Sequence, residues 1–118
     1  MTDLVACLST GKGTWVHVAK LIKDQNWDKV FLITNQFGKE KFTPDEKTEL
    51  IVVDSNKPIN ELVEDIRKSL VGKLSMGDAA VNLISGTGKE HMALLSALLK
   101  LGAGIRLIVS TDSGVKEV

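Results

Sequence analysis

Short apolar runs recur along the chain, and each is bounded by polar residues or glycine. Runs without alternation of polar and apolar positions are typical of strands that are buried on both faces of a parallel sheet. The pattern predicts such strands at residues 4–8, 30–33, 50–53, 79–84 and 105–109. Turn residues at 110–114 are followed by residues 115–118, which would add a short antiparallel strand at the sheet edge.

Between several of these runs, apolar residues recur at helical spacing, which predicts helices that connect the strands. After the first run, the helical positions are Trp15, Val18, Ala19 and Ile22. The clearest amphipathic helix follows Pro58, which suits the first position of a helix. Its apolar stripe is formed by Ile59, Leu62, Val63, Ile66 and Leu70.

Residues 36–48 break this regular alternation of strands and helices. The stretch 36–42 mixes polar, apolar and glycine residues, and 43–46 resembles a turn or the first turn of a short helix. A doubly wound fold would normally have a full crossover helix here. We therefore expect a shortened or irregular crossover.

The helix expected after the fourth strand is apolar almost all round. At about 100° per residue, one side carries Met92, Leu95 and Leu99, and the opposite side carries a second leucine set. That second set is Leu94, Leu98 and Leu101. A helix of this kind is buried on more than one side. We expect a homodimer to cover the outer side; the alternative is cover by the helix that begins near Trp15.

Strands that alternate with helices predict the fold class. The chain is expected to form one α/β domain over residues 1–118, a Rossmann-like three-layer sandwich with a mostly parallel five- to six-stranded sheet. Reversal of the chain between the two halves of such a sheet leaves a crevice at the carboxyl ends of the strands. The loops after the first and fourth strands are expected to form its walls.

Composition narrows the class of partner. The chain has 15 basic and 15 acidic residues, so no overall field would attract long nucleic acid or an anionic membrane. Cys7 is the only cysteine, which excludes a disulfide within the chain and fits a reducing compartment. The sequence shows neither a signal peptide nor a membrane span, and we expect a cytoplasmic protein.

Several standard sites can be tested against the spacing of residues. The phosphate-binding P-loop pattern fails because Leu83 and Glu90 stand where it needs a glycine and a hydroxyl residue. The dinucleotide fingerprint is incomplete, because Val16 occupies the position of its third glycine. Asn35 also occupies the position where an acidic residue would hold the ribose. His17 and His91 form neither a metal-ligand cluster nor a catalytic triad in the sequence, so we expect no metal ion and no cofactor.

Two loops remain as candidate ligand sites. They are Ser9-Thr10-Gly11-Lys12-Gly13-Thr14 after the first strand and Ser85-Gly86-Thr87-Gly88-Lys89 after the fourth. Each combines hydroxyls, a lysine and glycines that let the backbone approach a ligand, a combination that suits phosphates and ribose hydroxyls. His91 lies in the first turn of the following helix, where it could contact the same ligand. The alternative is that both loops are tight turns with capping hydroxyls.

The second loop and its surroundings resemble the signature of CARF domains, the Rossmann-like sensor domains of type III CRISPR systems. The resemblance lies in Val81-Asn82-Leu83-Ile84-Ser85-Gly86-Thr87-Gly88-Lys89, in Met92 of a Leu/Ala-rich helix, and in residues 102–107. Ser85-Gly86-Thr87 is similar to the Gly-Gly-Thr part of the family's turn, and Gly88 is one residue more than that turn has. The loop at 9–14 matches the family's other ligand-binding loop in position and composition.

The resemblance implies a homodimer that binds a cyclic oligoadenylate across two equivalent crevices, as part of antiviral signalling. Binding would involve Lys12 and Lys89 for phosphate charge and the loop glycines for backbone N–H groups. The implied ligand-binding residues are Gly11, Gly13, Thr14, Asn35, Ser85, Gly86, Thr87, Gly88 and His91.

Stand-alone members of the family can be ring nucleases, which cut the bound ring without a metal. The reaction is in-line attack of a ribose 2′-OH on the adjacent phosphorus, and the protein holds the geometry and stabilises charge. The candidate catalytic residues are Ser9, Thr10, Lys12 and Lys89. Two other classes stay open: a Rossmann-like enzyme domain that uses a mononucleotide or dinucleotide, and a non-catalytic dimerisation or interaction domain.

Overall fold

The computed structural model describes residues 2–8, 12–75 and 77–118, with Lys12 described by its backbone alone. The strands are β1 (Asp3–Leu8), β2 (Val30–Thr34), β3 (Thr48–Val52), β4 (Asp78–Asn82), β5 (Gly104–Thr111) and β6 (Gly114–Glu117). The helices are α1 (Trp15–Asp24), α2 (Gln36–Lys41), α3 (Ile59–Leu70) and α4 (Gly88–Lys100), with a 3-10 turn at Lys12–Thr14 before α1.

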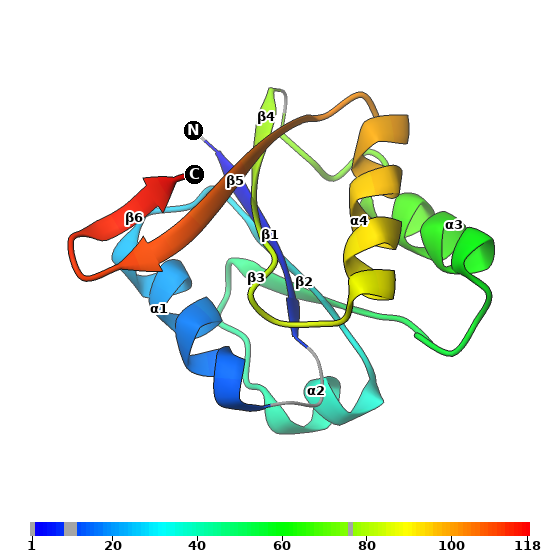
Figure 1. Cartoon of the computed structure of the whole chain (residues 1–118), viewed down its shortest axis with the longest axis horizontal. Helices are drawn as coiled ribbons and strands as arrows, with labels where there is room; N and C mark the ends of the chain where they lie inside the picture. The colour runs from blue at the N-terminus through cyan, green and yellow to red at the C-terminus, as the bar shows by residue number, and fades with distance from the viewer. Residues whose placement is uncertain (1, 9–11, 76) are drawn as a thin grey trace.

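One sheet carries all the strands of the described chain, in the order β3-β2-β1-β4-β5-β6 (Figure 1). Neighbouring strands are parallel except β6, which runs antiparallel to β5. The predicted α/β fold with a mostly parallel sheet and an antiparallel edge strand is therefore confirmed. The chain reverses direction across the sheet between β1 and β4, which makes this pair the switch point of the fold.

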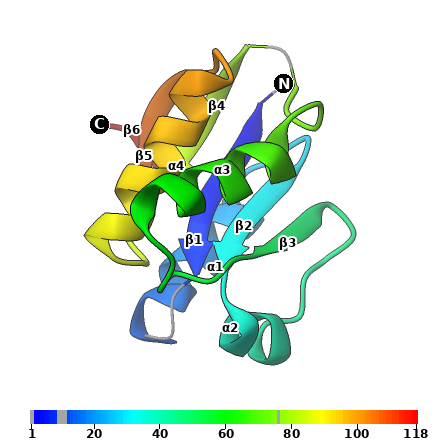
Figure 2. The same cartoon turned by 90° about the vertical axis from the view of Figure 1, so that its right-hand side faces the viewer.

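Helices cover the sheet from both sides, so that the molecule has three layers (Figure 2). The apolar residues of α3 and α4 form one core with Val5 and Cys7 of β1. Those of α1 form a second core with the alternate β1 residues Leu4, Ala6 and Leu8. The period of two along a strand explains why an uninterrupted apolar run can serve both cores.

The crossover is shortened, as expected: its helix covers only Gln36–Lys41. A turn follows at 45–48, where the Thr48 N–H donates to the Asp45 carbonyl at 3.2 Å, so the turn interpretation of this region holds and the helical one does not.

Asn35 starts α2, because its side-chain Oδ1 accepts a hydrogen bond from the backbone N–H of Gly38 at 2.9 Å. Gly38 also lies against Thr34, and an ideal Cβ on Gly38 would overlap Thr34 Oγ1. The position of this helix thus depends on a contact that the apolar pattern does not contain.

Substituting Gly38→Ala is expected to destabilise the fold by about 1–3 kcal/mol, because Thr34 is buried and the new methyl group has no space. Urea denaturation would measure the loss in free energy of unfolding. The effect of Gly38→Ala should shrink in a Thr34→Ala background, which removes the clashing atoms. Equal losses in both backgrounds would show that this contact does not place α2.

One side of α4 has no cover within the described chain. Leu94 and Leu98 are fully buried, whereas Met92 is 64% exposed and Leu99 is 66% exposed. The alternative that α1 covers this side is wrong, because α1 packs on the opposite face of the sheet. No helix among the described residues is long and apolar enough to cross a membrane.

Candidate functional site

The two candidate loops follow neighbouring parallel strands. Ala6 of β1 pairs with Asn82 of β4, so both strands end at the same edge of the sheet (Figure 1). An ideal Cβ on Gly86 would lie 3.1 Å from Cys7 Cβ, which shows that the loop after β4 passes close to the end of β1. The carboxyl ends of these two strands therefore lie together. The expected crevice between the two loops stays a prediction, because residues 9–11 lie outside the described residues.

Part of the first loop lies outside the described residues. Ser9, Thr10, Gly11 and the side chain of Lys12 are in this part. Gly13 is exposed and Thr14 is half-buried at the start of α1. The assignment of ligand contacts to Ser9–Thr14 therefore stays a prediction from the sequence.

The second loop is tightly organised. Ser85 is 1% exposed, and its carbonyl oxygen accepts a 2.8 Å hydrogen bond from His91 Nε2. Gly86 has φ +108°, a backbone conformation that favours glycine. A side chain there would also meet His91 and Glu90. Gly86 and the buried Ser85 thus hold the loop in place, while Gly88 and Lys89 are exposed.

Thr87 and Glu90 form a capping box at the start of α4. Thr87 Oγ1 accepts from the Glu90 N–H at 3.2 Å, and Glu90 Oε1 accepts from the Thr87 N–H at 2.7 Å. The alternative stated from the sequence, a tight turn with a capping hydroxyl, is therefore confirmed for Thr87; the pairing of Thr87 with Glu90 was not recognised from the sequence. Its consequence is that the Thr87 hydroxyl and N–H, expected to face a ligand, are already bonded within the loop.

The Glu90 carboxylate joins this loop to another one. Glu90 is 6% exposed, and its Oε2 accepts a 2.6 Å hydrogen bond from Ser55 Oγ, in the loop between β3 and α3. Among the described residues, no acceptor faces the backbone N–H groups of Gly88 and Lys89, which lie in the first turn of α4. These N–H groups and the Lys89 side chain are what the loop can offer to an anion.

Cys7 lies under the loop as a buried, neutral thiol. Burial, with a smaller contribution from the negative charge of Glu90, raises the pKa of Cys7 to about 12. Because the thiolate is the reactive form, this cysteine is a packing residue rather than a nucleophile.

The Cys7 pKa predicts a pH dependence of stability. The unfolded thiol ionises near its ordinary value of 9.0, and the folded thiol ionises near 12. The free energy of unfolding should therefore fall between pH 9 and 12, by at most about 1.4 kcal/mol per pH unit from this group. Denaturation curves of wild type and Cys7→Ala at pH 8 and 10.5 would measure it. Identical pH dependence in the two proteins would contradict the buried-thiol assignment.

Asn35 lies at the carboxyl end of β2, two strands from β4. It forms part of the wall of a hollow of about 620 Å³ at the carboxyl ends of β2 and β3. This hollow, the end of β1 and the loop after β4 lie at the same edge of the sheet. No cluster of three or more potential metal ligands occurs in the part of the chain that the structure describes.

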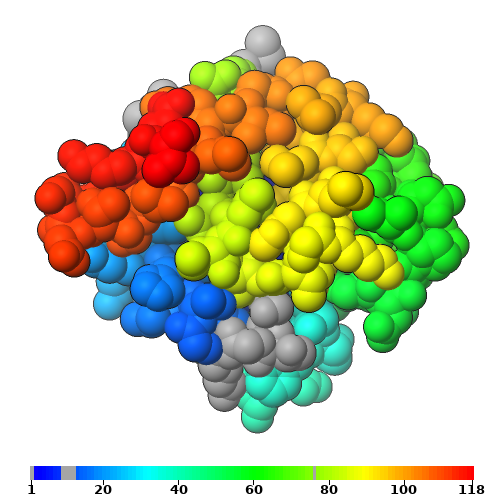
Figure 3. Space-filling view, in the orientation of Figure 1, coloured from blue at the N-terminus to red at the C-terminus, as the bar shows by residue number. Residues whose placement is uncertain are grey.

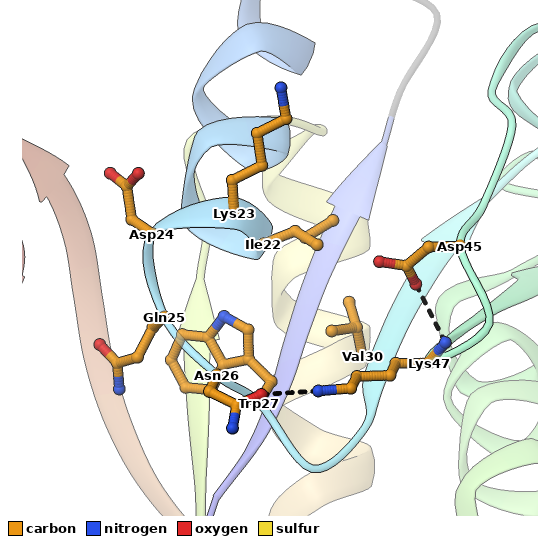
Figure 4. A pocket seen from close by; sticks show the side chains of 9 residues that line it. All are labelled: Ile22, Lys23, Asp24, Gln25, Asn26, Trp27, Val30, Asp45 and Lys47. Atoms are coloured by element: carbon orange, nitrogen blue, oxygen red, sulfur yellow. Dashed lines mark hydrogen bonds between the residues drawn. The ribbon is translucent and has the colours of Figure 1, made fainter.

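A second hollow, of about 310 Å³, lies at the other edge of the sheet, beside Trp27 (Figure 4). Three of its polar residues bond to one another: Lys47 Nζ donates to Asn26 Oδ1 at 2.6 Å, and the Lys47 N–H donates to Asp45 Oδ1 at 3.0 Å. The indole N–H of Trp27 donates to the Leu21 carbonyl at 2.8 Å. This hollow lies at the opposite edge of the sheet from the loop after β4.

No family model matches the chain, and no curated protein matches it either. The resemblance to CARF domains therefore rests on the residues quoted from the sequence.

Proposed function

We propose that two copies of this chain pair through α4 and bind one cyclic oligoadenylate across the paired surface, as part of type III CRISPR antiviral signalling. The observation that carries this proposal is an uncovered apolar side of α4 that begins within one turn of the candidate loop. The proposed ligand class follows from the sequence resemblance, and the proposed pairing follows from the exposed apolar side of α4.

The uncovered surface, here called the α4 face, consists of Met92, Leu95 and Leu99 with Leu107 of β5. Leu107 is 40% exposed. It pairs with Val81 of β4, whose side chain belongs to the core under α3 and α4, so Leu107 is on the same face of the sheet as α4. Figure 3 shows α4 and β5 side by side on one face of the molecule. A hollow of about 590 Å³ runs along the helix between Met92 and Lys100. Contiguous exposed apolar surface of this kind is typical of a protein interface.

A second copy fits this surface because the stripe is self-complementary. Met92, Leu95, Ser96 and Leu99 have the spacing of an interhelical seam, and the small Ser96 lets two helices approach. A ring held by both loops requires the two helix N-termini to lie at the same end. The two-fold axis must therefore run nearly parallel to α4; antiparallel pairing would separate the N-termini by roughly 20 Å.

Pairing of this kind doubles the anion-binding groups. Each copy would contribute the free N–H groups of Gly88 and Lys89 and the exposed Lys89 ammonium. A cyclic oligoadenylate has phosphates arranged with rotational symmetry, so it can meet two identical loops at once. Cleavage, where it occurs, would use in-line attack by a 2′-OH, with Ser9, Thr10, Lys12 and Lys89 as the candidate groups.

Direct binding tests the proposal. Isothermal titration with cyclic tetra-adenylate and cyclic hexa-adenylate in EDTA is expected to give saturable binding of one of the two rings. Chromatography of the same mixtures after incubation separates a sensor, which returns the intact ring, from a ring nuclease, which gives linear products. Absence of binding for both rings would overturn the ligand assignment.

A further inference from the structure

The hollow at the carboxyl ends of β2 and β3 adjoins the loop that would hold a phosphate. Ser55 lines this hollow and donates to Glu90 Oε2 at 2.6 Å, while Glu90 Oε1 holds the Thr87 N–H at 2.7 Å. One buried carboxylate thus links a lining residue of the hollow to the α4 loop. Because Ser55 and Thr87 bond to the same carboxylate, the hollow is the neighbouring site toward which the base of a nucleotide with its phosphate at Gly88 and Lys89 would extend.

The hollow has the character of a base-binding site. Its volume of about 620 Å³ lies within the usual range for small-ligand pockets. Val52 and Val53 are its apolar lining residues, and Val52, at the end of the edge strand β3, is 42% exposed. An aromatic base packed there would cover this apolar surface.

Asn35 offers an incompletely used amide at the rim. Its Oδ1 accepts from the Gly38 N–H at 2.9 Å, and a carbonyl oxygen has a second lone pair. Its Nδ2 donates no hydrogen bond to the described residues. The orientation of the amide is fixed, since the Gly38 N–H requires an acceptor.

We infer that this hollow binds an adenine base and that Asn35 selects adenine over guanine. An asparagine amide pairs with adenine by donating to N7 and accepting from the N6 amino group. Guanine presents acceptors at both N7 and O6, so Oδ1 would face an oxygen. The inference rests on the proposed function, because it takes the ring's bases as the source of adenine.

Asn35→Asp is the sharpest test. Aspartate caps a helix as well as asparagine does, so α2 should remain in place, but the Nδ2 donor is lost. The two ligands are cyclic tetra-adenylate and the same ring built from 7-deazaadenosine, which lacks the N7 acceptor. If the wild type binds cyclic hexa-adenylate instead, the six-membered ring and its 7-deaza analogue are used. Wild type should bind the 7-deaza ring about tenfold more weakly or worse, and Asn35→Asp should bind both rings equally.

Asn60→Asp provides the matched control, because it adds the same charge at an exposed position of α3 outside the hollow. It should keep the wild-type preference for the ring with N7. Thermal melts would check that all three proteins fold. Equal binding of the two rings by wild type, or a preference for the ring with N7 that persists in Asn35→Asp, would overturn the role assigned to Asn35. The proposed function would stand in either case. Failure of wild type to bind any ring would overturn the proposed function and this inference together.

Discussion

Leu99→Glu is expected to leave the chain monomeric and to weaken cyclic oligoadenylate binding by roughly 100-fold or more, because two facing carboxylates would have to be desolvated in the pair. Leu99 is 66% exposed in the single chain, so its own fold should lose no more than about 0.5 kcal/mol. Sedimentation at tens of micromolar protein and ring titration would measure the two effects.

The control for this substitution is Val71→Glu. Val71 is also exposed, at 54%, but it follows the last residue of α3, at the opposite edge of the sheet from the loop after β4. This variant should stay dimeric and bind the ring as wild type does. A monomeric wild type, or a Leu99→Glu variant that remains dimeric, would contradict pairing through the α4 face.

The direction of pairing can be tested with the same helix. In the parallel arrangement, Met92→Cys and Leu99→Cys should each form a disulfide with the same residue of the second copy, since equivalent positions meet along the axis. Cys7 is buried and would not compete. Antiparallel helices would cross-link at neither position, and that result would exclude one ring shared by both loops.

Lys89→Met is the second substitution with a large expected effect. It removes one phosphate-pairing charge from each copy, and two charge-assisted hydrogen bonds lost together should weaken ring binding by roughly 100-fold. The dependence of affinity on salt should also decrease. Ring titrations at 50 and 200 mM salt would measure both quantities.

Lys68→Met removes an equivalent exposed charge from α3 and should change neither the affinity nor its salt dependence. Affinity that survives in Lys89→Met would mean that the α4 loop does not hold the phosphate. The effect of Lys89→Met is informative because the Thr87 N–H already donates to Glu90 Oε1 within the capping box. Lys89 is therefore the charged group of the loop that remains to pair with a phosphate.

The sheet could be predicted from the sequence because parallel strands are buried on both faces and therefore appear as unbroken apolar runs. Leu4–Leu8 is such a run, and its residues alternate between the two cores. The exposed side of α4 could also be anticipated, since its apolar residues exceed what one sheet face can bury. Strand β4 ends at Asn82, earlier than its apolar run suggests, because Asn82 bonds to the Ile84 N–H and to the Ile108 carbonyl.

Contacts between distant residues account for what the sequence analysis missed. The short α2 depends on Gly38 against Thr34 and on Phe37 and Phe42 around Trp15, with ring centroids 6.0 Å apart in each pair. The bond from Ser55 to Glu90 joins loops 35 residues apart, which no local spacing can indicate. The capping hydroxyl of Thr87 was among the sequence-based alternatives, because a threonine before a helical pattern is a local signal.

Native mass spectrometry of the wild-type chain with cyclic tetra-adenylate or cyclic hexa-adenylate tests the central claim most directly, because it reports chains and rings in one complex. We predict a species of two chains with one ring, and its loss in Leu99→Glu. A single chain that carries a whole ring, or a dimer that carries neither ring, would contradict a binding site shared by two copies.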